Sequence, residues 1–350
     1  MDWNHGGDWA GFELEYGVPP LDFSANVSPL GMPEGARQAA VRALGDASAY
    51  PDPGCRALRR ALSAHHGVPA DKILCGCGAS DLIYRLVAAL RPREALVTAP
   101  TFSEYEAALV LHGCRVRRVP LREEWDFVPE QSFPEWITPE TDAAFLCSPN
   151  NPTGRTVPPA LLGRILARCR ETGTLLVLDA CFADFLDAPE EQSLLRELRA
   201  GGLLILRAFT KFYGMAGLRL GYCLCEDEAL LERMACSGPP WAVSCAAQAA
   251  GIAALEDAEY VRRLRELIIR ERSAVAAGLT ACGFRVIPGE ANYLLFRSGD
   301  PGLGGRLRAR GILIRDCRDF HGLGPGWYRT AVRTEAENQR LLETLQEVTA

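Results

Sequence analysis

The chain has 350 residues and a formal net charge of −6 at neutral pH, with 38 lysines and arginines against 44 aspartates and glutamates. An acidic chain without a basic tract is not typical of nucleic-acid-binding proteins. No apolar run reaches the roughly 18 residues of a membrane-spanning helix, and the opening MDWNHGGDWAG does not resemble a signal peptide. We therefore expect a cytoplasmic protein that binds neither nucleic acid nor membrane.

The first forty or so residues show one short helix and no other regular pattern, and we expect them to pack against a smaller C-terminal unit. In the middle of the chain, short apolar runs alternate with helical patterns, which predicts a mostly parallel sheet covered by helices on both faces. The expected strands are residues 72–75, 95–100, 114–120, 143–149, 174–179, 203–209 and 219–225, and the expected helices among them include 80–91, 103–113 and 159–173.

The pattern changes after about Trp241. A long helical region, residues 246–283, is followed by the short apolar runs GFRVIPG, ANYLLFR, ILIRD and WYRTAVR and by a closing helix, TEAENQRLLETLQEV. These elements predict a smaller α+β unit. We place a large domain at residues 45–240 and a small domain in residues 1–44 and 241–350.

The spacing of the cysteines and histidines does not predict a metal site. The thirteen cysteines have no repeating spacing, and Cys75-Gly-Cys77 lacks the second pair that a zinc site needs. We interpret the cysteines as reduced thiols, most of them in the core. The pair His65-His66 follows a helical stretch and precedes GVP, so we expect a solvated helix end and no metal.

Polar residues follow several of the expected strands, where ligands bind in parallel sheets. The corner GCGAS contains Gly78, Ala79 and Ser80 before a helix, a pattern that favours an anion such as phosphate. Asn151, in NNPTG, either closes an Asx turn or donates to a ligand oxygen. Asp179 ends an apolar strand, and it either caps the next turn or serves as counter-ion to a protonated ring nitrogen.

The strand at 203–209 leads to Thr210 and Lys211. Only two residues of the chain are lysines, Lys72 and Lys211, so arginine supplies nearly every cation. Arginine cannot replace lysine as a nucleophilic amine, because its guanidinium stays protonated. A retained lysine therefore indicates imine chemistry with a carbonyl compound. Arg219 begins the next strand and suits a phosphate dianion. Together these residues supply what is needed to hold pyridoxal 5′-phosphate.

The segments SPNNPTG, LLVLD and TKFYGMAGLRLGY resemble the signature of fold-type I pyridoxal-phosphate enzymes of the aspartate aminotransferase superfamily. The resemblance covers essentially the whole chain. It implies an α/β fold with a large domain, built on a mixed, mostly parallel seven-stranded sheet covered by helices, and a smaller α+β domain. It also implies a homodimer with active sites at the subunit interface.

The resemblance assigns roles to single residues. Lys211 would hold the cofactor covalently, Asp179 would pair with its ring nitrogen, and Asn151 would bond its phenolic oxygen. Phe102 would stack on the ring. The residues expected at the phosphate are Gly78, Ala79, Ser80, Thr210, Arg219 and, from the neighbouring subunit, Tyr50. The chain departs from the family at Phe182, where a tyrosine is usual, so one donor to the phenolic oxygen is missing.

Finer features resemble one subgroup, the L-threonine-O-3-phosphate decarboxylases of cobalamin biosynthesis, whose close relatives are histidinol-phosphate aminotransferases. These features are HGGD, DFSANVSPLG, GPPWAVS, GEANYLLFR, ILIRDCRDFHGLG and YRTAVRTEAENQRLL. The resemblance implies release of carbon dioxide from L-threonine O-3-phosphate to give (R)-1-amino-2-propanol O-2-phosphate. The residues that would bind the substrate carboxylate and phosphate are His5, Gly6, Asn26, Asn151, Arg315, Arg329 and Arg333.

Three alternatives remain open at this point. The first is an aminotransferase acting on a phosphorylated amine such as histidinol phosphate. The second is a decarboxylase that prefers O-phospho-L-serine, which differs by one methyl group. The third is a non-catalytic regulator, which the lack of a spare segment and of a basic patch disfavours. For Arg333, a surface ion pair is an alternative to substrate binding, and Lys72 receives no role beyond starting a strand.

Overall fold

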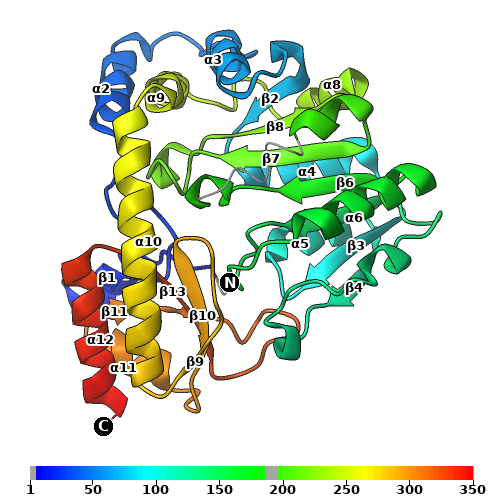
Figure 1. Ribbon diagram of the computed structural model, residues 1–350. Helices are drawn as coiled ribbons and strands as arrows, with labels where there is room; N and C mark the ends of the chain where they lie inside the picture. The colour runs from blue at the N-terminus through cyan, green and yellow to red at the C-terminus, as the bar shows by residue number, and fades with distance from the viewer. Residues whose placement is uncertain (1–4, 187–194, 350) are drawn as a thin grey trace.

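The computed structural model describes residues 5–186 and 195–349 (Figure 1). Its largest element is a seven-stranded sheet in the order β2-β8-β7-β6-β5-β3-β4. β8 runs antiparallel to both of its neighbours, and the pairs between β7 and β4 are parallel, so the sheet is mixed and mostly parallel. The strands are β2 (Ile73–Gly76), β3 (Glu94–Ala99), β4 (Arg115–Pro120), β5 (Ala143–Cys147), β6 (Leu175–Asp179), β7 (Leu203–Ala208) and β8 (Gly221–Cys225). All seven predicted strands are confirmed.

Helices cover both faces of this sheet because successive strand residues point to opposite sides. Leu96 belongs to the apolar cluster on one face, whereas Val97 belongs to the cluster on the other. The first face is covered by α3 (Arg56–His66), α6 (Pro159–Thr172) and α9 (Cys245–Leu255), and the second by α4 (Ala79–Leu90), α5 (Ser103–Leu111) and α8 (Glu228–Cys236). Burial on both faces explains why the inner strands β5, β6 and β7 are nearly continuous apolar runs, whereas the edge strand β4 carries three exposed or half-exposed arginines.

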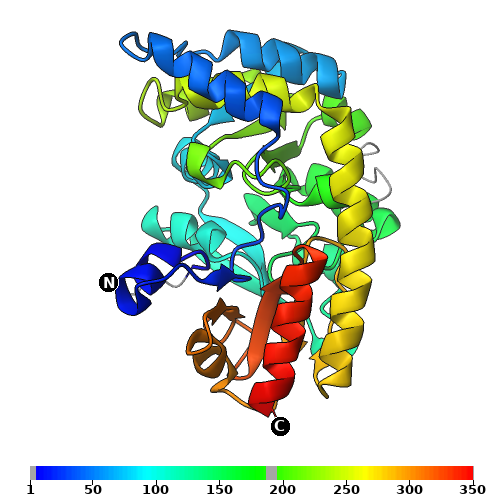
Figure 2. The same cartoon turned by 90° about the vertical axis from the view of Figure 1, so that its left-hand side faces the viewer.

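The smaller part lies beside the sheet and is linked to it by the long helix α10 (Ala258–Ala281), seen best in Figure 2. The expected single helical region is two helices, because the chain turns between α9 and α10, where the Asp257 side chain caps α10 by accepting from the N–H of Tyr260. An antiparallel sheet has the order β12-β13-β10-β9. Its strands are β9 (Arg285–Val286), β10 (Tyr293–Arg297), β12 (Arg315–Asp316) and β13 (Trp327–Ala331), and α11 (Leu303–Arg308) and α12 (Glu335–Thr349) complete this part.

The N-terminal segment is more regular than expected and packs on both parts. It holds two helices, α1 (Trp9–Tyr16) and α2 (Glu34–Ala43). The short strand β1 (Leu21–Asp22) pairs in parallel with β11 (Ile312–Leu313) of the smaller part. α2 instead packs along α9 beside the large sheet (Figure 1). The boundaries at residues 44/45 and 240/241 stay a prediction.

Short 3-10 helices fill several connections: η1 (Leu44–Asp46), η2 (Ala70–Lys72), η3 (Glu123–Trp125), η4 (Phe133–Trp136), η5 (Ala183–Phe185), η6 (Leu198–Ala200) and η7 (Ala216–Leu218). Among the described helices, none combines the length and apolar character needed to cross a membrane.

Candidate active site

A cavity of about 440 Å³ opens at the carboxyl ends of β5, β6 and β7, where the N-terminal segment and the smaller part meet the large sheet. This is where the strand–helix alternation predicted ligand binding. Thirteen of the predicted site residues line it: His5, Gly6, Asn26, Ala79, Ser80, Phe102, Asn151, Asp179, Thr210, Lys211, Arg219, Arg315 and Arg329.

Lys211 lies in the cavity at the end of β7, and the N–H of Ser28 fixes its backbone by donating to its carbonyl at 2.9 Å. Burial, together with the nearby Arg329 cation, lowers the pKa of the Lys211 amine to about 8. Roughly a tenth of the Lys211 amine is therefore neutral and nucleophilic at pH 7, far more than at the ordinary lysine pKa of about 10.4.

The other lysine, Lys72, has a structural explanation. Its ammonium contacts the carboxylates of Glu226 at 3.0 Å and Glu228 at 2.7 Å, and it donates to the Glu226 carbonyl at 2.9 Å. These three acceptors match the three N–H groups of an ammonium. Lys72 therefore serves as a compact ion-pairing group away from the cavity.

Asp179 ends β6 with its carboxylate held from two sides. One oxygen accepts from the N–H of Cys181 at 2.9 Å, and the other accepts from the Tyr105 hydroxyl at 2.5 Å. The bond from the Cys181 N–H matches the alternative that Asp179 caps the next turn. The other carboxylate oxygen remains for Tyr105 and the cavity. Sequence reasoning missed Tyr105. Its signal was a tyrosine in the first turn of the helix that follows Phe102, close in sequence to a predicted site residue.

Two distant motifs form an anion cradle. Gly78, with φ 87°, precedes α4, and a Cβ built on it would lie 2.7 Å from Nη2 of Arg219. A Cβ on Gly221 would lie 2.7 Å from the backbone of Gly78 and Ala79. The segments GCGAS and GLRLGY therefore meet so closely that only glycine fits at both positions. Their contact aims the Arg219 guanidinium and the positive N-terminus of α4 at one place.

Arg329, on β13, joins the smaller part to the cavity. Its guanidinium donates to Oδ1 of Asn151 and, at 2.7 Å, to the carbonyl of Ser24, while its Nε has no partner. Because Oδ1 of Asn151 accepts from a cation, its amide NH₂ is the group left for a ligand oxygen. Oδ1 of Asn26 is also buried without a partner.

Arg315 and His5 also line the cavity. Arg315 donates to the carbonyl of Asp316 and to the carboxylate of Asp319, each at 2.6 Å. His5 lies 3.1 Å from the Glu104 carboxylate and stays half exposed. Gly6 packs its Cα against the Ser24 carbonyl so tightly that a Cβ would collide with it.

Three predicted residues do not line the cavity. Gly78 lies behind it, against Arg219. Arg333 points elsewhere: its guanidinium pairs with Glu337 at 2.6 Å and donates to the Asp22 carbonyl, which matches the ion-pair alternative. Tyr50 is 79% exposed and stacks on Trp241 with ring centroids 4.5 Å apart.

Phe182, at the position where a tyrosine is usual, lines the cavity and packs edge-on against Tyr293, with centroids 4.9 Å apart. The site thus has an aromatic contact where the family has a hydroxyl donor.

The sequence and the fold were compared with those of known proteins. The family model for aminotransferase class I and II matches residues 18–345. The chain belongs to the aminotransferase class I and II family. It is 39% identical to threonine-phosphate decarboxylase of Salmonella typhimurium, over 98% of this chain and 96% of that protein. It is 36% identical to histidinol-phosphate aminotransferase of Symbiobacterium thermophilum, over 95% and 92%. The structure of histidinol-phosphate aminotransferase from Clostridium acetobutylicum superposes with a TM-score of 0.87 at 27% identity, covering 93% and 98%.

Members of this family use pyridoxal 5′-phosphate. The cavity fits this cofactor on its own chemistry. It holds one partly buried amine with a lowered pKa, one carboxylate held in place by a hydroxyl, and a cradle of backbone and guanidinium donors at a helix start. These groups suit an aldehyde, a ring nitrogen and a phosphate respectively.

The pH dependence of cofactor capture follows from the lowered pKa of Lys211. Below pH 8 the amine is mostly protonated and cannot attack an aldehyde, whereas above pH 8 it is mostly neutral. We expect the rate at which apoprotein captures pyridoxal 5′-phosphate to rise about tenfold per pH unit below this value and to level off above it. The absorbance of the bound cofactor measures this rate. A midpoint near the ordinary lysine pKa of about 10.4 would contradict the prediction.

The contact between the two glycine segments gives a second prediction. Gly221→Ala would force the backbone of Gly78 and Ala79 apart. We expect it to lower the free energy of unfolding by about 1–3 kcal/mol and to weaken cofactor binding at least about tenfold. Gly217→Ala, in the same motif with open space around it, is the matched control and should leave stability unchanged or raise it by up to about 1 kcal/mol. Denaturant titration and cofactor titration test both variants, and equal behaviour of the two would refute the cradle.

Proposed function

We propose that the protein is a decarboxylase of L-threonine O-3-phosphate. The observation that carries this proposal is the pair of arginines, Arg315 and Arg329, that the smaller part brings to the Lys211 cavity. A substrate with a phosphate and a carboxylate needs two cationic subsites, and guanidinium forks suit both groups. The 39% identity with a threonine-phosphate decarboxylase supports the same substrate.

The residues of the cavity have distinct roles in the proposed reaction. When bound, pyridoxal 5′-phosphate supplies an electron sink for the bond that breaks at the substrate Cα. Arg315, Arg329 and His5 orient the substrate so that the bond from Cα to the carboxylate is the one aligned to break. Asp179, held by Tyr105, keeps a proton on the ring nitrogen of the cofactor. Lys211 returns a proton to Cα after carbon dioxide has left.

We propose that the protein works as a homodimer with active sites at the subunit interface. Tyr50 and Trp241 form an exposed aromatic pair outside the cavity of their own chain. In the dimer, Tyr50 reaches the cofactor phosphate of the neighbouring subunit. Light scattering of purified protein tests the dimer, and Tyr50→Phe tests the contact through a weaker cofactor affinity.

An aminotransferase acting on a phosphorylated amine is the second candidate, favoured by the 36% identity with a histidinol-phosphate aminotransferase. One experiment separates the two. Cofactor-loaded enzyme is given L-threonine O-3-phosphate without any keto acid. Release of carbon dioxide and aminopropanol phosphate supports the decarboxylase. Turnover only of histidinol phosphate, and only with 2-oxoglutarate, assigns the site to transamination. A parallel assay with O-phospho-L-serine tests whether the methyl group matters.

A further inference from the structure

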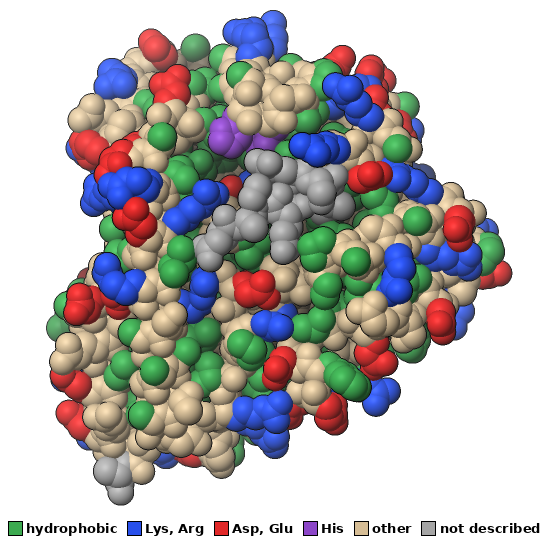
Figure 3. Space-filling model, viewed as in Figure 1, with side chains coloured by type: hydrophobic (Ala, Val, Ile, Leu, Met, Phe, Trp, Pro, Cys, Tyr) green, Lys and Arg blue, Asp and Glu red, His purple; other side chains and the backbone are tan. Residues whose placement is uncertain are grey.

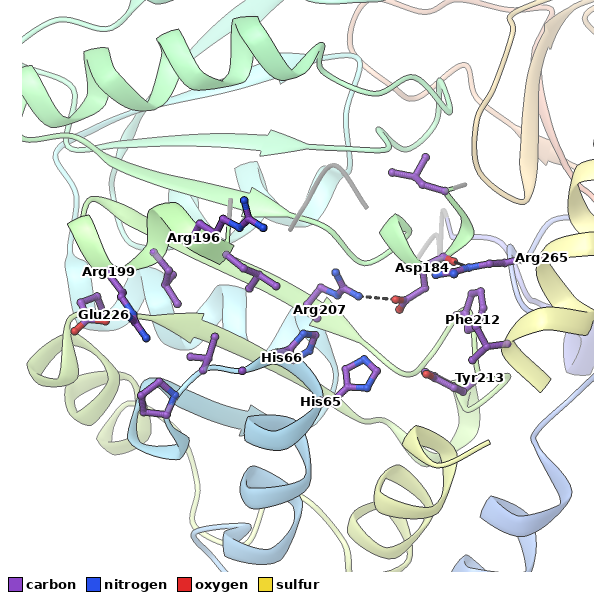
Figure 4. A pocket seen from close by; sticks show the side chains of 17 residues that line it. His65, His66, Asp184, Arg196, Arg199, Arg207, Phe212, Tyr213, Glu226 and Arg265 are labelled. Atoms are coloured by element: carbon purple, nitrogen blue, oxygen red, sulfur yellow. Dashed lines mark hydrogen bonds and ion pairs between the residues drawn. The ribbon is translucent and has the colours of Figure 1, made fainter. Parts of the chain in front are cut away.

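Charged side chains of both signs are mixed over the face seen in Figure 3, and exposed pairs of this kind contribute little to stability. Ionisable groups that are withdrawn from water and unused by the proposed reaction need a separate explanation. One of them is His66, at the end of α3 (Figure 4). Its ring is half-buried, and its Nε2 lies 2.7 Å from the Tyr222 hydroxyl.

The His66 ring is neutral at physiological pH, because burial, together with the nearby Arg207 cation, lowers its pKa to about 2. The prediction of a solvated helix end is therefore wrong for His66 and holds for the exposed His65. The contact with Tyr222 gives His66 a structural role.

A buried ion pair lies behind the anion cradle. Nε of Arg85 donates to Oδ1 of Asp81, one turn earlier on α4, at 2.8 Å. The Arg85 side chain is only 7% exposed. Asp81 lies in the first turn of α4, but unlike its neighbours Ala79 and Ser80 it does not line the catalytic cavity. The pair therefore supports the cradle from the side that faces away from a ligand.

Asp81 fixes the turn that forms the cradle. Its other oxygen, Oδ2, accepts from the N–H of Cys77 at 2.8 Å, so one carboxylate spans the turn from β2 into α4. A Cβ built on Gly76 would lie 2.8 Å from this oxygen, so glycine leaves room for the carboxylate. The bond holds the backbone between Cys77 and Ser80 in the shape that presents the first N–H groups of α4 to an anion.

The Asp81 carboxylate also has an electrostatic effect on the cradle. A negative charge in the first turn of a helix is favourable by itself. A phosphate held at the same helix start has the same sign of charge, however, and like charges at close range disfavour each other. The Arg85 guanidinium offsets the charge of Asp81 and leaves both carboxylate oxygens where they are.

Arg85 is itself held by the segment that follows α8. Its Nη1 lies 3.5 Å from the carbonyl of Ala235, and its Nη2 donates to the carbonyl of Pro239 at 3.3 Å. A Cβ built on Gly238 would lie 2.3 Å from Cζ of Arg85, so this segment packs directly on the guanidinium. Protein groups thus contact all three guanidinium nitrogens, which a lysine ammonium could not reproduce.

We propose that Arg85 is a positioning residue for the cofactor phosphate. Through Asp81 it fixes the turn from Cys77 to Ser80, and it offsets a negative charge directly behind that turn. The proposal rests on the assignment of this cradle to the phosphate of pyridoxal 5′-phosphate. It does not depend on which reaction the enzyme catalyses.

Spectroscopic titration of the full-length, cofactor-free protein with pyridoxal 5′-phosphate, and separately with pyridoxal, tests the proposal, because pyridoxal lacks the phosphate. Arg85→Met removes the cation, whereas Arg85→Lys keeps a cation without the fork. Asp81→Asn, added to Arg85→Met, removes the carboxylate charge but keeps an oxygen for the N–H of Cys77. Arg262→Met is the matched control, because it removes an exposed arginine that pairs with Glu266 at the same helical spacing.

We expect Arg85→Met to bind pyridoxal 5′-phosphate at least about tenfold more weakly than the unmodified protein does, and to bind pyridoxal with unchanged affinity. Adding Asp81→Asn should restore the affinity for pyridoxal 5′-phosphate to within about threefold, because removing the whole pair leaves no buried charge. Arg85→Lys and Arg262→Met should also stay within about threefold of the unmodified protein.

A double variant that binds pyridoxal 5′-phosphate as weakly as Arg85→Met would overturn the proposal, as would equal weakening for the two aldehydes. If Arg85→Met does not fold, the double variant and Arg85→Lys decide, and a loss of about tenfold in both contradicts the proposal. Gly221→Ala, which disturbs the cradle from its other side, identifies the cause of a failure. If it weakens both aldehydes equally, the phosphate binds elsewhere. If it weakens only the phosphorylated one, the cradle holds the phosphate and Arg85 has a purely structural role.

Discussion

Lys211→Ala is expected to lower kcat by more than about 10²–10⁴-fold, because that range is the contribution of proton transfer alone. The amine at this position has a second task, since it is also the group that bonds covalently to the cofactor. Its position at the end of β7 and its lowered pKa support both roles. Release of carbon dioxide from L-threonine O-3-phosphate measures the loss.

The chain offers a matched control, because its only other lysine is Lys72. Lys72 pairs with Glu226 and Glu228 away from the cavity, so Lys72→Ala should keep both turnover and covalently bound cofactor. Borohydride reduction followed by peptide mass analysis should place the cofactor on Lys211 in the unmodified enzyme and in Lys72→Ala, and nowhere in Lys211→Ala. Native turnover in Lys211→Ala would remove the chemical basis of the proposed function.

The large sheet could be predicted from the sequence because its inner strands are buried on both faces, although the edge strand β4 is mostly exposed. Such buried strands are continuous apolar runs, so each can be predicted without knowing which strand it pairs with. The fully buried β5 and β7 are examples. The smaller part was harder to predict. The run ILIRD is two strands, β11 and β12, which pair with β1 and β13 in different sheets. Two-residue strands are selected by tertiary pairing, which leaves no periodicity to detect.

Within the site, the sequence predicted residue types better than contacts. Lys211, Asp179 and Asn151 could be proposed because unusual residues at strand ends indicate chemistry. The contact between Arg329 and Asn151 joins residues from β13 and from the turn after β5, so only the packing of the smaller part against the large sheet creates it. The sequence also could not predict the contacts of Arg333. It lies in the same segment as Arg329, YRTAVR, but its side chain pairs with Glu337.

Arg329→Gln is expected to produce the second large effect. Arg329 is 6% exposed and donates to Asn151 and to Ser24. Removing one partner of a buried charged contact costs about 2 kcal/mol or more, which is about thirtyfold in kcat/KM. The loss should fall mainly on KM, because the guanidinium is proposed to bind a substrate anion. Steady-state kinetics with L-threonine O-3-phosphate measures it, and an unchanged KM would contradict this role.

The same substitution should change the titration of Lys211, which separates an electrostatic role from a purely structural one. The Arg329 cation disfavours protonation of the Lys211 amine and so contributes to its lowered pKa. Removing this cation should therefore raise the pKa, and the midpoint of cofactor capture should move above 8. Arg329→Lys keeps the charge and loses the fork, so it should raise KM while leaving the midpoint near 8. If both variants show the same midpoint, the Arg329 charge does not reach Lys211, and burial alone sets the reactivity of the amine.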